Sequence, residues 1–189
     1  DGASLLSTMF HGLLAGGYWR DERGANVIDS GAPWYDTYRT RDGQYVAIGA
    51  IESKFYGELL ERLGLADRPL PHQYDRARWP ELRALFAAAF ATKTRDEWCA
   101  TFEGSDACFA PVLTFGEARE HPQSAARNGF VDVGGIAQPA PAPRFGRTPG
   151  AVTGAPPARG AGGREALTDW GFGPEEVERL VALGVGFAR

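Results

Sequence analysis

The sequence predicts an α+β domain over residues 34 to about 135, followed by an extended strap and a helical tail. Strand-like and helix-like segments mix through 34–135, as expected for a small sheet covered by helices. Of the 26 residues in 138–163, 18 are Pro, Gly or Ala, so this strap cannot bury enough apolar area to form a core. Beyond it, Pro174 and the two glutamates after it open an amphipathic helix.

Residues 1–33 are expected to form a helix and a linker. Apolar residues lie on one helical stripe over 3–15, and the Gly16-Gly17 pair ends that stripe. The chain opens in the middle of this pattern, with neither a Met nor the basic start of a signal peptide. We therefore expect a fragment that begins inside a helix.

Residues 34–50 predict a β-hairpin, because two runs rich in aromatic and branched residues flank an Asp42-Gly43 turn signal. A helix over 53–63 follows, and Gly64 is the residue expected to end it. The side chains expected to point inward from this helix are Phe55, Leu59, Leu60 and Leu63.

The rest of the domain continues the mixture of helices and strands. The apolar spacing predicts a helix over Trp79–Phe90, and the Thr94–Glu97 capping box predicts a helix that reaches Phe102. The remaining expected elements are a strand at 108–113, a helix that begins after Thr114, a helical turn at 122–128 and a strand at 130–136.

Composition limits the classes of function. Hydrophobic content of 43%, charged content of 23% and a net charge of −4 are typical of a soluble globular protein. No cluster of Lys and Arg marks a nucleic-acid surface. No apolar run approaches the ~18–20 residues that cross a bilayer, so we expect no membrane partner. Two cysteines, Cys99 and Cys108, suit free thiols in a reducing cytoplasm.

Chemistry-bearing residues are sparse. Glu52 sits between the second strand of the hairpin and the helix that follows, where it either stabilises the start of the helix or faces a site. His11, His72 and His121 have no ligand spacing with one another or with a cysteine, so no metal site is expected. The nucleophile-elbow, phosphate-loop and dinucleotide-binding motifs are also missing.

Three stretches, 24–65, 79–118 and 167–180, together resemble one known family. They contain the motifs D-S-G-A-P-W-Y at 29–35 and G-A-I-E-S-K-F-Y at 49–56. These stretches resemble the α-methylacyl-CoA racemases, a branch of the family III CoA-transferase group. They occur in the same order as in that family, and the resemblance covers nearly the whole chain.

The resemblance implies an α/β family fold with a large Rossmann-like domain, a small α+β domain and a C-terminal segment that returns to the large domain. Residues 1–33 would then be the end of a large-domain helix and a linker, and 34–137 the small domain. The extended strap would be 138–163, and 164–189 would hold helices that dock on the large domain. The N-terminal Rossmann-like domain would be absent, and the complete enzyme would be an interlocked homodimer.

The resemblance also implies a reaction and its residues. The reaction is interconversion of (2R)- and (2S)-2-methylacyl-CoA thioesters through an enolate, with no cofactor beyond the CoA of the substrate. Glu52 matches the family's glutamate that pairs with a catalytic His, and that His and its Asp partner lie upstream of Asp1. Ile51, Tyr35 and Ile28 match positions near the acyl chain, and CoA itself is expected to bind mainly to the absent domain.

Two other functions remain open at this stage. One is CoA transfer of the carnitine or formyl-CoA type, although family members of that kind carry a glycine run where this chain has D-S-G-A-P-W at 29–34. The other is a catalytically silent oligomerisation module, since the fragment would lack the His and the Asp.

Overall fold

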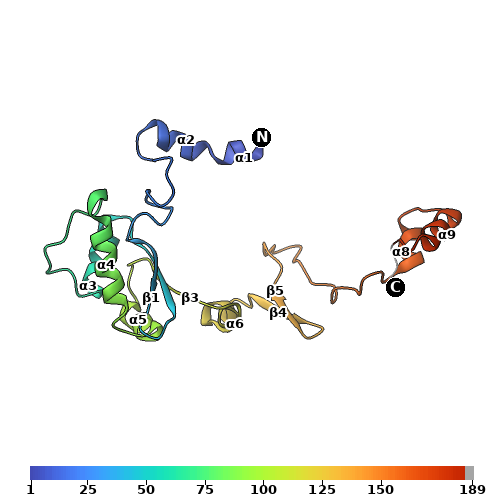
Figure 1. The fold of residues 1–189 in the computed structure, drawn as a ribbon. Coiled ribbons are helices and arrows are strands. Elements are labelled where there is room, and N and C mark those ends of the chain that lie inside the picture. Colours follow the sequence, from blue (N-terminus) through green and yellow to red (C-terminus); the bar gives the residue numbers. More distant parts are fainter. Residues whose placement is uncertain (186–189) are drawn as a thin grey trace. The chain divides into compact units, whose positions relative to one another are not determined.

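A computed structural model describes residues 1–185 and divides the chain into two units (Figure 1). The first unit runs from Asp1 to Thr114, and the second begins at Phe115. The boundary between the two units therefore lies within residues 34–137, which the sequence analysis assigned to the small domain.

The first unit contains the predicted hairpin, extended by a third strand. β1 (Tyr35–Arg39), β2 (Tyr45–Gly49) and β3 (Phe109–Val112) form an antiparallel sheet in the order β1-β2-β3. Alternate residues of each strand face opposite sides, so one face of the sheet is buried and the other is open. We call the open side, which carries Tyr35, Thr37, Ala47, Gly49 and Ala110, the outer face.

Helices of the first unit cover the buried side of this sheet (Figure 1). They are α3 (Ser53–Arg62), the 3₁₀ turn η1 (Arg76–Arg78), α4 (Trp79–Phe90) and α5 (Arg95–Phe102). The predicted bounds of α4 and α5 are confirmed, and the predicted capping box is present between Thr94 and Glu97. The α+β class predicted for this part of the chain is therefore confirmed.

The end of α3 shows how local sequence sets an element boundary. Gly64 adopts φ +68°, a left-handed conformation in which a side chain would be strained. Its N–H reaches the Glu61 carbonyl at 3.0 Å, and the Leu65 N–H reaches the Leu60 carbonyl at 2.8 Å. Both bonds satisfy carbonyls that the last turn of the helix would otherwise leave unpaired.

Aromatic side chains dominate the core between helices and sheet. Trp34 is fully buried, and its ring meets that of Trp79 edge to face at 5.2 Å between centroids. Trp98 meets Phe90 in the same manner at 5.2 Å. Each such buried side chain contributes roughly 1.5–3 kcal/mol through the hydrophobic effect. Trp79 and Trp98 lie in the core, as their aromatic side chains in amphipathic helices would lead one to expect, whereas the sequence analysis did not place Tyr56 of α3 among the buried residues.

The N-terminal stripe forms two short helices rather than one. They are α1 (Gly2–Leu6) and α2 (Thr8–Ala15), with Ser7 between them, and neither contains a buried residue. Leu5, Leu6 and Met9 are all more than half exposed.

In the second unit the prediction of one strand at 130–136 is wrong. This segment forms a hairpin of β4 (Phe130–Val133) and β5 (Ile136–Pro139), joined by a turn at Gly134 and Gly135. Both glycines have positive φ, and the Asp132 carboxylate accepts the Gly135 N–H at 3.0 Å. The Gly-Gly pair is a standard signal for a two-residue turn, and it predicts the hairpin that the structure has.

The other elements of the second unit are short helices. They are α6 (Phe115–Glu120), α7 (Pro122–Ala126), α8 (Gly163–Asp169) and α9 (Pro174–Ala182). Between Pro139 and Gly163 the described chain contains no helix or strand. The predicted start of α9 at Pro174 is confirmed, and its Val177 is 4% exposed. The last four residues of the predicted C-terminal segment, 186–189, lie outside the described residues.

Candidate active site

Glu52 lies in the short link between β2, which ends at Gly49, and α3, which begins at Ser53. The apolar β2 leads into the link, and Ala50 there is fully buried and donates its N–H to the Trp34 carbonyl at 3.0 Å. The link therefore leaves the sheet in a direction that the core determines.

The carbonyls of this link are held by the segment that precedes η1. The Gln73 side-chain amide donates to the carbonyl of Ala50 at 3.1 Å and to that of Ile51 at 3.0 Å. The Tyr74 hydroxyl donates to the same Ile51 carbonyl at 2.9 Å. Sequence reasoning missed both residues, because Gln and Tyr in a loop carry no signal of burial or of a distant partner.

Glu52 occupies the N-cap position of α3 with an extended backbone, φ −74° and ψ 143°. Its side chain is exposed and makes no capping hydrogen bond to the helix. Only its carbonyl takes part in the helix, accepting the Tyr56 N–H at 2.9 Å. The structure therefore shows no side-chain cap at Glu52, and its carboxylate is exposed at the start of α3.

The outer face of the sheet carries a shallow pocket of about 400 Å³. Small side chains form most of its floor, and the Tyr35 ring lies against Gly49, where a Cβ atom would sit 3.6 Å from it. Cys108 also lines the pocket, and burial followed by the negative charges of Glu52 and Asp106 raises the pKa of its thiol. Glu52 itself does not line this pocket.

The structure brings only some of the expected acyl-chain residues to this pocket. Tyr35 lines it, whereas Ile28 and Ile51 do not. Ile51 is partly buried and packs against the core. Ile28 is 39% exposed and belongs to the loop before β1.

That loop is organised by two polar side chains. Asn26, which is fully buried, accepts the Arg20 N–H at 2.7 Å and donates to the Arg20 carbonyl at 3.0 Å. Asp29 accepts the N–H groups of Asn26 at 2.8 Å and of Gly31 at 3.1 Å. Burial opposes ionisation of Asp29, but hydrogen bonds from Asn26, Gly31 and Gly24 outweigh it and lower the pKa of this carboxyl.

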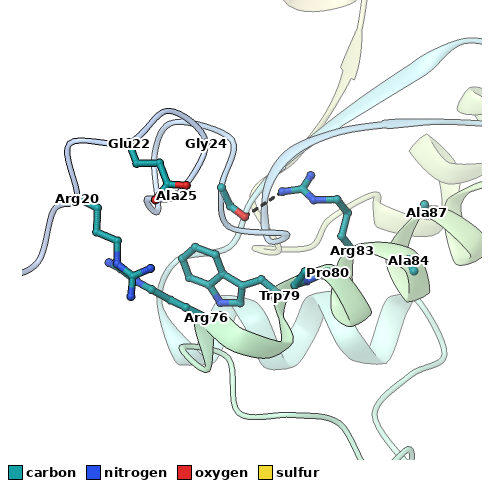
Figure 2. Close-up of a pocket in the computed structure, with 11 residues that line it drawn as sticks. Arg20, Glu22, Gly24, Ala25, Arg76, Trp79, Pro80, Arg83, Ala84 and Ala87 are labelled. Atoms are coloured by element: carbon teal, nitrogen blue, oxygen red, sulfur yellow. Dashed lines mark hydrogen bonds between the residues drawn. The ribbon is translucent and has the colours of Figure 1, made fainter.

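A larger cavity of about 460 Å³ lies between this loop and α4 (Figure 2). Figure 2 shows Arg83 reaching from α4 to the loop, where it donates to the Gly31 carbonyl at 2.9 Å. Arg83 also donates to the Ser30 carbonyl at 2.7 Å and pairs with Asp36. Arg83 thus joins loop, sheet and helix. This cavity contains none of the residues predicted for the site, and we assign it no chemistry.

Neither a metal centre nor a disulfide is seen in the described part of the chain. No group of three His, Cys, Asp or Glu side chains is arranged to hold a metal ion among residues 1–185. Cys99 and Cys108 are both free thiols, as predicted. None of the helices in this range combines the length and hydropathy needed to cross a bilayer.

The chain is similar to two mammalian proteins named alpha-methylacyl-CoA racemase. It is 44% identical to the Mus musculus protein over 183 residues, which cover 95% of the chain and 48% of that relative. It is 40% identical to the Homo sapiens protein over 186 residues, again 95% of the chain and 48% of the relative. The chain thus spans about half the length of these relatives.

A more distant relative carries a different name. A Fusarium pseudograminearum protein named acyl-CoA transferase is 32% identical over 80% of the chain and 36% of its own length.

Solved structures show the same fold. A CAIB/BAIF family protein from Brucella suis matches 88% of the chain and 44% of its own length with a TM-score of 0.64, at 20% identity. The Mycobacterium tuberculosis protein Rv3272 matches 72% of the chain and 39% of its own length with a TM-score of 0.58, at 26% identity. Residues 2–162 match CoA-transferase family III. The chain therefore belongs to CoA-transferase family III.

Proposed function

We propose that this chain is the C-terminal part of a racemase that interconverts (2R)- and (2S)-2-methylacyl-CoA thioesters. The observation that carries the proposal is the identity of 44% and 40% to two proteins named alpha-methylacyl-CoA racemase, each over 95% of the chain. The position of Glu52 supports it, because its carboxylate has no capping role within α3.

The chemical problem in this reaction is the weak acidity of the substrate. The α-proton of a thioester has a pKa near ~20, so its removal at neutral pH needs a positioned base and donors that stabilise the enolate oxygen. Inversion also needs two groups on opposite faces of the α-carbon, one to remove the proton and one to return it. The family resemblance puts these groups, a His and an Asp, upstream of Asp1 in the complete enzyme.

Glu52 is then the residue that orients the catalytic His. A carboxylate that accepts a hydrogen bond from an imidazole selects one ring orientation and stabilises the imidazolium form. The rigid link between β2 and α3 suits this role, since its buried Ala50 and hydrogen-bonded carbonyls hold the backbone of Glu52 in place.

The outer face is the part of this chain that we propose to lie beside the acyl chain. Tyr35 and the small side chains around it offer an apolar surface of the kind that a branched fatty tail would cover. Ile51 and Ile28 do not line this pocket, so the proposal that they lie near the acyl chain rests on the family resemblance. CoA would bind mainly to the N-terminal domain, and the reaction would need no metal or further cofactor.

For the complete enzyme we propose a homodimer in the cytoplasm. The free thiols of Cys99 and Cys108 are compatible with a reducing compartment.

CoA transfer is the alternative reaction, and the Fusarium relative favours it at 32% identity. The decisive experiment incubates the complete enzyme with (2S)-2-methylacyl-CoA in D₂O, with and without a free carboxylic acid as acceptor. A racemase incorporates deuterium at the α-carbon and forms the (2R) epimer without the acceptor. Formation of a new acyl-CoA that depends on the acceptor, without α-deuteration, would instead establish the transferase.

A further inference from the structure

Gln73 is a buried polar residue in an irregular segment, 22 residues after Ile51 in the link that carries Glu52. Its side chain is 7% exposed, and its single amide nitrogen donates to two successive carbonyls, those of Ala50 and Ile51. These are the two residues immediately before Glu52. We propose that Gln73 is a positioning residue, which sets the direction of the Glu52 carboxylate through the main chain.

The first step of the argument concerns what else could set that direction. The Glu52 side chain makes no hydrogen bond to the start of α3, so the helix does not hold the carboxylate through a cap. The side chain is also exposed, so it is not held by tight packing. Its orientation therefore depends on the backbone of the link, and on the groups that hold that backbone.

The second step concerns the chemistry of those groups. A primary amide carries two N–H donors on one nitrogen, and can therefore serve two carbonyls that lie close together. An ionised carboxylate of the same shape accepts but cannot donate, and a thioether has no donor either. Gln73 donates to the Ala50 carbonyl and shares the Ile51 carbonyl with the Tyr74 hydroxyl, and a buried carbonyl that loses its donor is costly.

The third step connects Gln73 to the rigid part of the molecule. Its own carbonyl accepts the Trp79 Nε1–H at 3.0 Å, and Trp79 is 5% exposed. Its neighbour Tyr74 adds a second donor to the Ile51 carbonyl at 2.9 Å. The core at the start of α4 is thus linked by hydrogen bonds to the backbone that precedes Glu52.

This inference rests on the proposed function, because positioning Glu52 matters for catalysis only if Glu52 orients a base. The test uses the complete enzyme with Gln73→Glu and Gln73→Met, which keep the length of the side chain and remove the donors. We expect kcat for α-proton exchange to fall by roughly 10- to 100-fold, as for a small displacement of a catalytic group. KM should change little, since neither variant touches the substrate.

The pH profile and a double-mutant cycle separate positioning from a general loss of stability. In the Gln73 variants the histidine limb of the pH–rate profile should move to lower pH, as in Glu52→Gln, because both weaken the carboxylate–imidazolium interaction. In a Glu52→Gln background, removal of the Gln73 donors should cost little further kcat. Independent, multiplicative losses of kcat in the double variant would overturn the inference.

Thr40→Val is the matched control. Thr40 is also buried, at 4% exposure, and its hydroxyl donates to the Asp42 carboxylate at 2.5 Å, but it lies at the other end of the β1–β2 hairpin. It should lower the melting temperature without moving the pH profile.

Two measurements keep the inference separate from the proposed function. The Tyr56 amide hydrogen, which bonds to the Glu52 carbonyl, should exchange faster with solvent in the Gln73 variants than in Thr40→Val, whatever reaction the enzyme performs. Failure of the wild-type enzyme to exchange the α-proton would defeat the proposed function instead. Normal kcat, pH profile and Tyr56 exchange in an active enzyme lacking the Gln73 donors would defeat the inference.

Should neither Gln73 variant fold, Tyr74→Phe takes their place. Its ring is 48% exposed, and the change removes only the second donor to the Ile51 carbonyl. A loss of kcat of roughly two- to tenfold, the value of one hydrogen bond, is expected. Both Gln73 bonds remain in this variant, so the deciding protein is the double variant Tyr74→Phe, Gln73→Asn, whose shorter amide draws the donors away from the carbonyls. A wild-type kcat in the double variant would overturn the inference.

Discussion

At the scale of single residues, side-chain chemistry alone does not tell a functional carboxylate from a structural one. Glu52 and Asp29 are both acids next to a buried part of the chain, yet their hydrogen bonds differ. Asp29 accepts four hydrogen bonds within its own loop, from Gly24, Gly31 and two groups of Asn26. Glu52 is exposed and makes no cap. The first residue is committed to the fold, and the second is available to a partner.

Glu52→Gln in the complete enzyme should lower the rate of α-proton exchange by about 10- to 10³-fold, the range for loss of one positioned acid–base partner. The change keeps the shape of the side chain and removes the charge that favours the imidazolium. The melting temperature should stay close to that of the wild type, because no capping bond is lost. A lowered melting temperature with normal exchange would instead make Glu52 a residue of the helix terminus.

Asp29→Asn should show the opposite result, a loss of stability. At neutral pH we expect the free energy of unfolding to fall by about 1–3 kcal/mol, because hydrogen bonds to a charged acceptor are lost. The folded-state pKa of Asp29 lies below its ordinary value of 3.8, so its contribution is complete above that value and disappears as the pH falls through the lowered pKa. Urea titrations from pH 7 to pH 3 should therefore show that the unfolding free energies of the wild type and of Asp29→Asn approach each other as the pH falls. The exposed Asp67→Asn serves as control, and a constant difference across this range would contradict the assignment.

At the scale of elements, boundaries follow local chemistry where a cap or a glycine specifies them. α5 begins where the Thr94 hydroxyl accepts the Glu97 N–H at 3.2 Å and the Glu97 carboxylate accepts the Thr94 N–H at 2.7 Å. A backbone hydrogen bond from Thr94 is the main reason that the pKa of Glu97 is lowered. The β4–β5 hairpin shows the same dependence on local chemistry, through its Gly-Gly turn.

Thr94→Ala should lower the free energy of unfolding by about 0.5–2 kcal/mol, the usual cost of losing an N-cap side chain. Urea denaturation of the 189-residue chain measures it. Thr153→Ala is the control. Thr153 lies in the segment without helix or strand, so its substitution should change the free energy of unfolding by no more than about 0.5 kcal/mol. Equal effects of the two substitutions would show that the capping box contributes nothing.

At the scale of the whole molecule, the large apolar side chains with the greatest exposure lie outside the sheet-and-helix core, and Phe115 at the start of α6 is 99% exposed. Leu6 in α1 is 83% exposed, and Trp170 after α8 is 87% exposed. By contrast, Trp34 and Trp98 in the sheet-and-helix core of the first unit are almost fully buried. Large apolar surfaces of this kind are usual at sites where protein packs on protein. This distribution agrees with our proposal that an N-terminal domain completes the enzyme.

The 189-residue chain alone should therefore exchange the α-proton of 2-methylacyl-CoA no faster than buffer, because the proposal puts the catalytic His and Asp outside it. Adding the separately expressed N-terminal domain should restore exchange, measured as deuterium incorporation by mass spectrometry. The control is the same mixture prepared with the Glu52→Gln chain, which should restore exchange less well if the two parts assemble correctly. Exchange by the pure 189-residue chain would refute this division of the active site.

The sequence by itself determined the parts of this protein that depend on near neighbours. The apolar spacing of Trp79–Phe90, the Thr94 capping box and Gly64 at the end of α3 each act within a few residues, so the chain carries the whole signal. Family resemblance then singled out Glu52. The tertiary structure decided which distant groups meet: Gln73 at the carbonyls before Glu52, and the Tyr35 ring against Gly49. These contacts arise when helices pack on a sheet and bring remote segments together, and no periodicity or cap in the sequence encodes such a meeting.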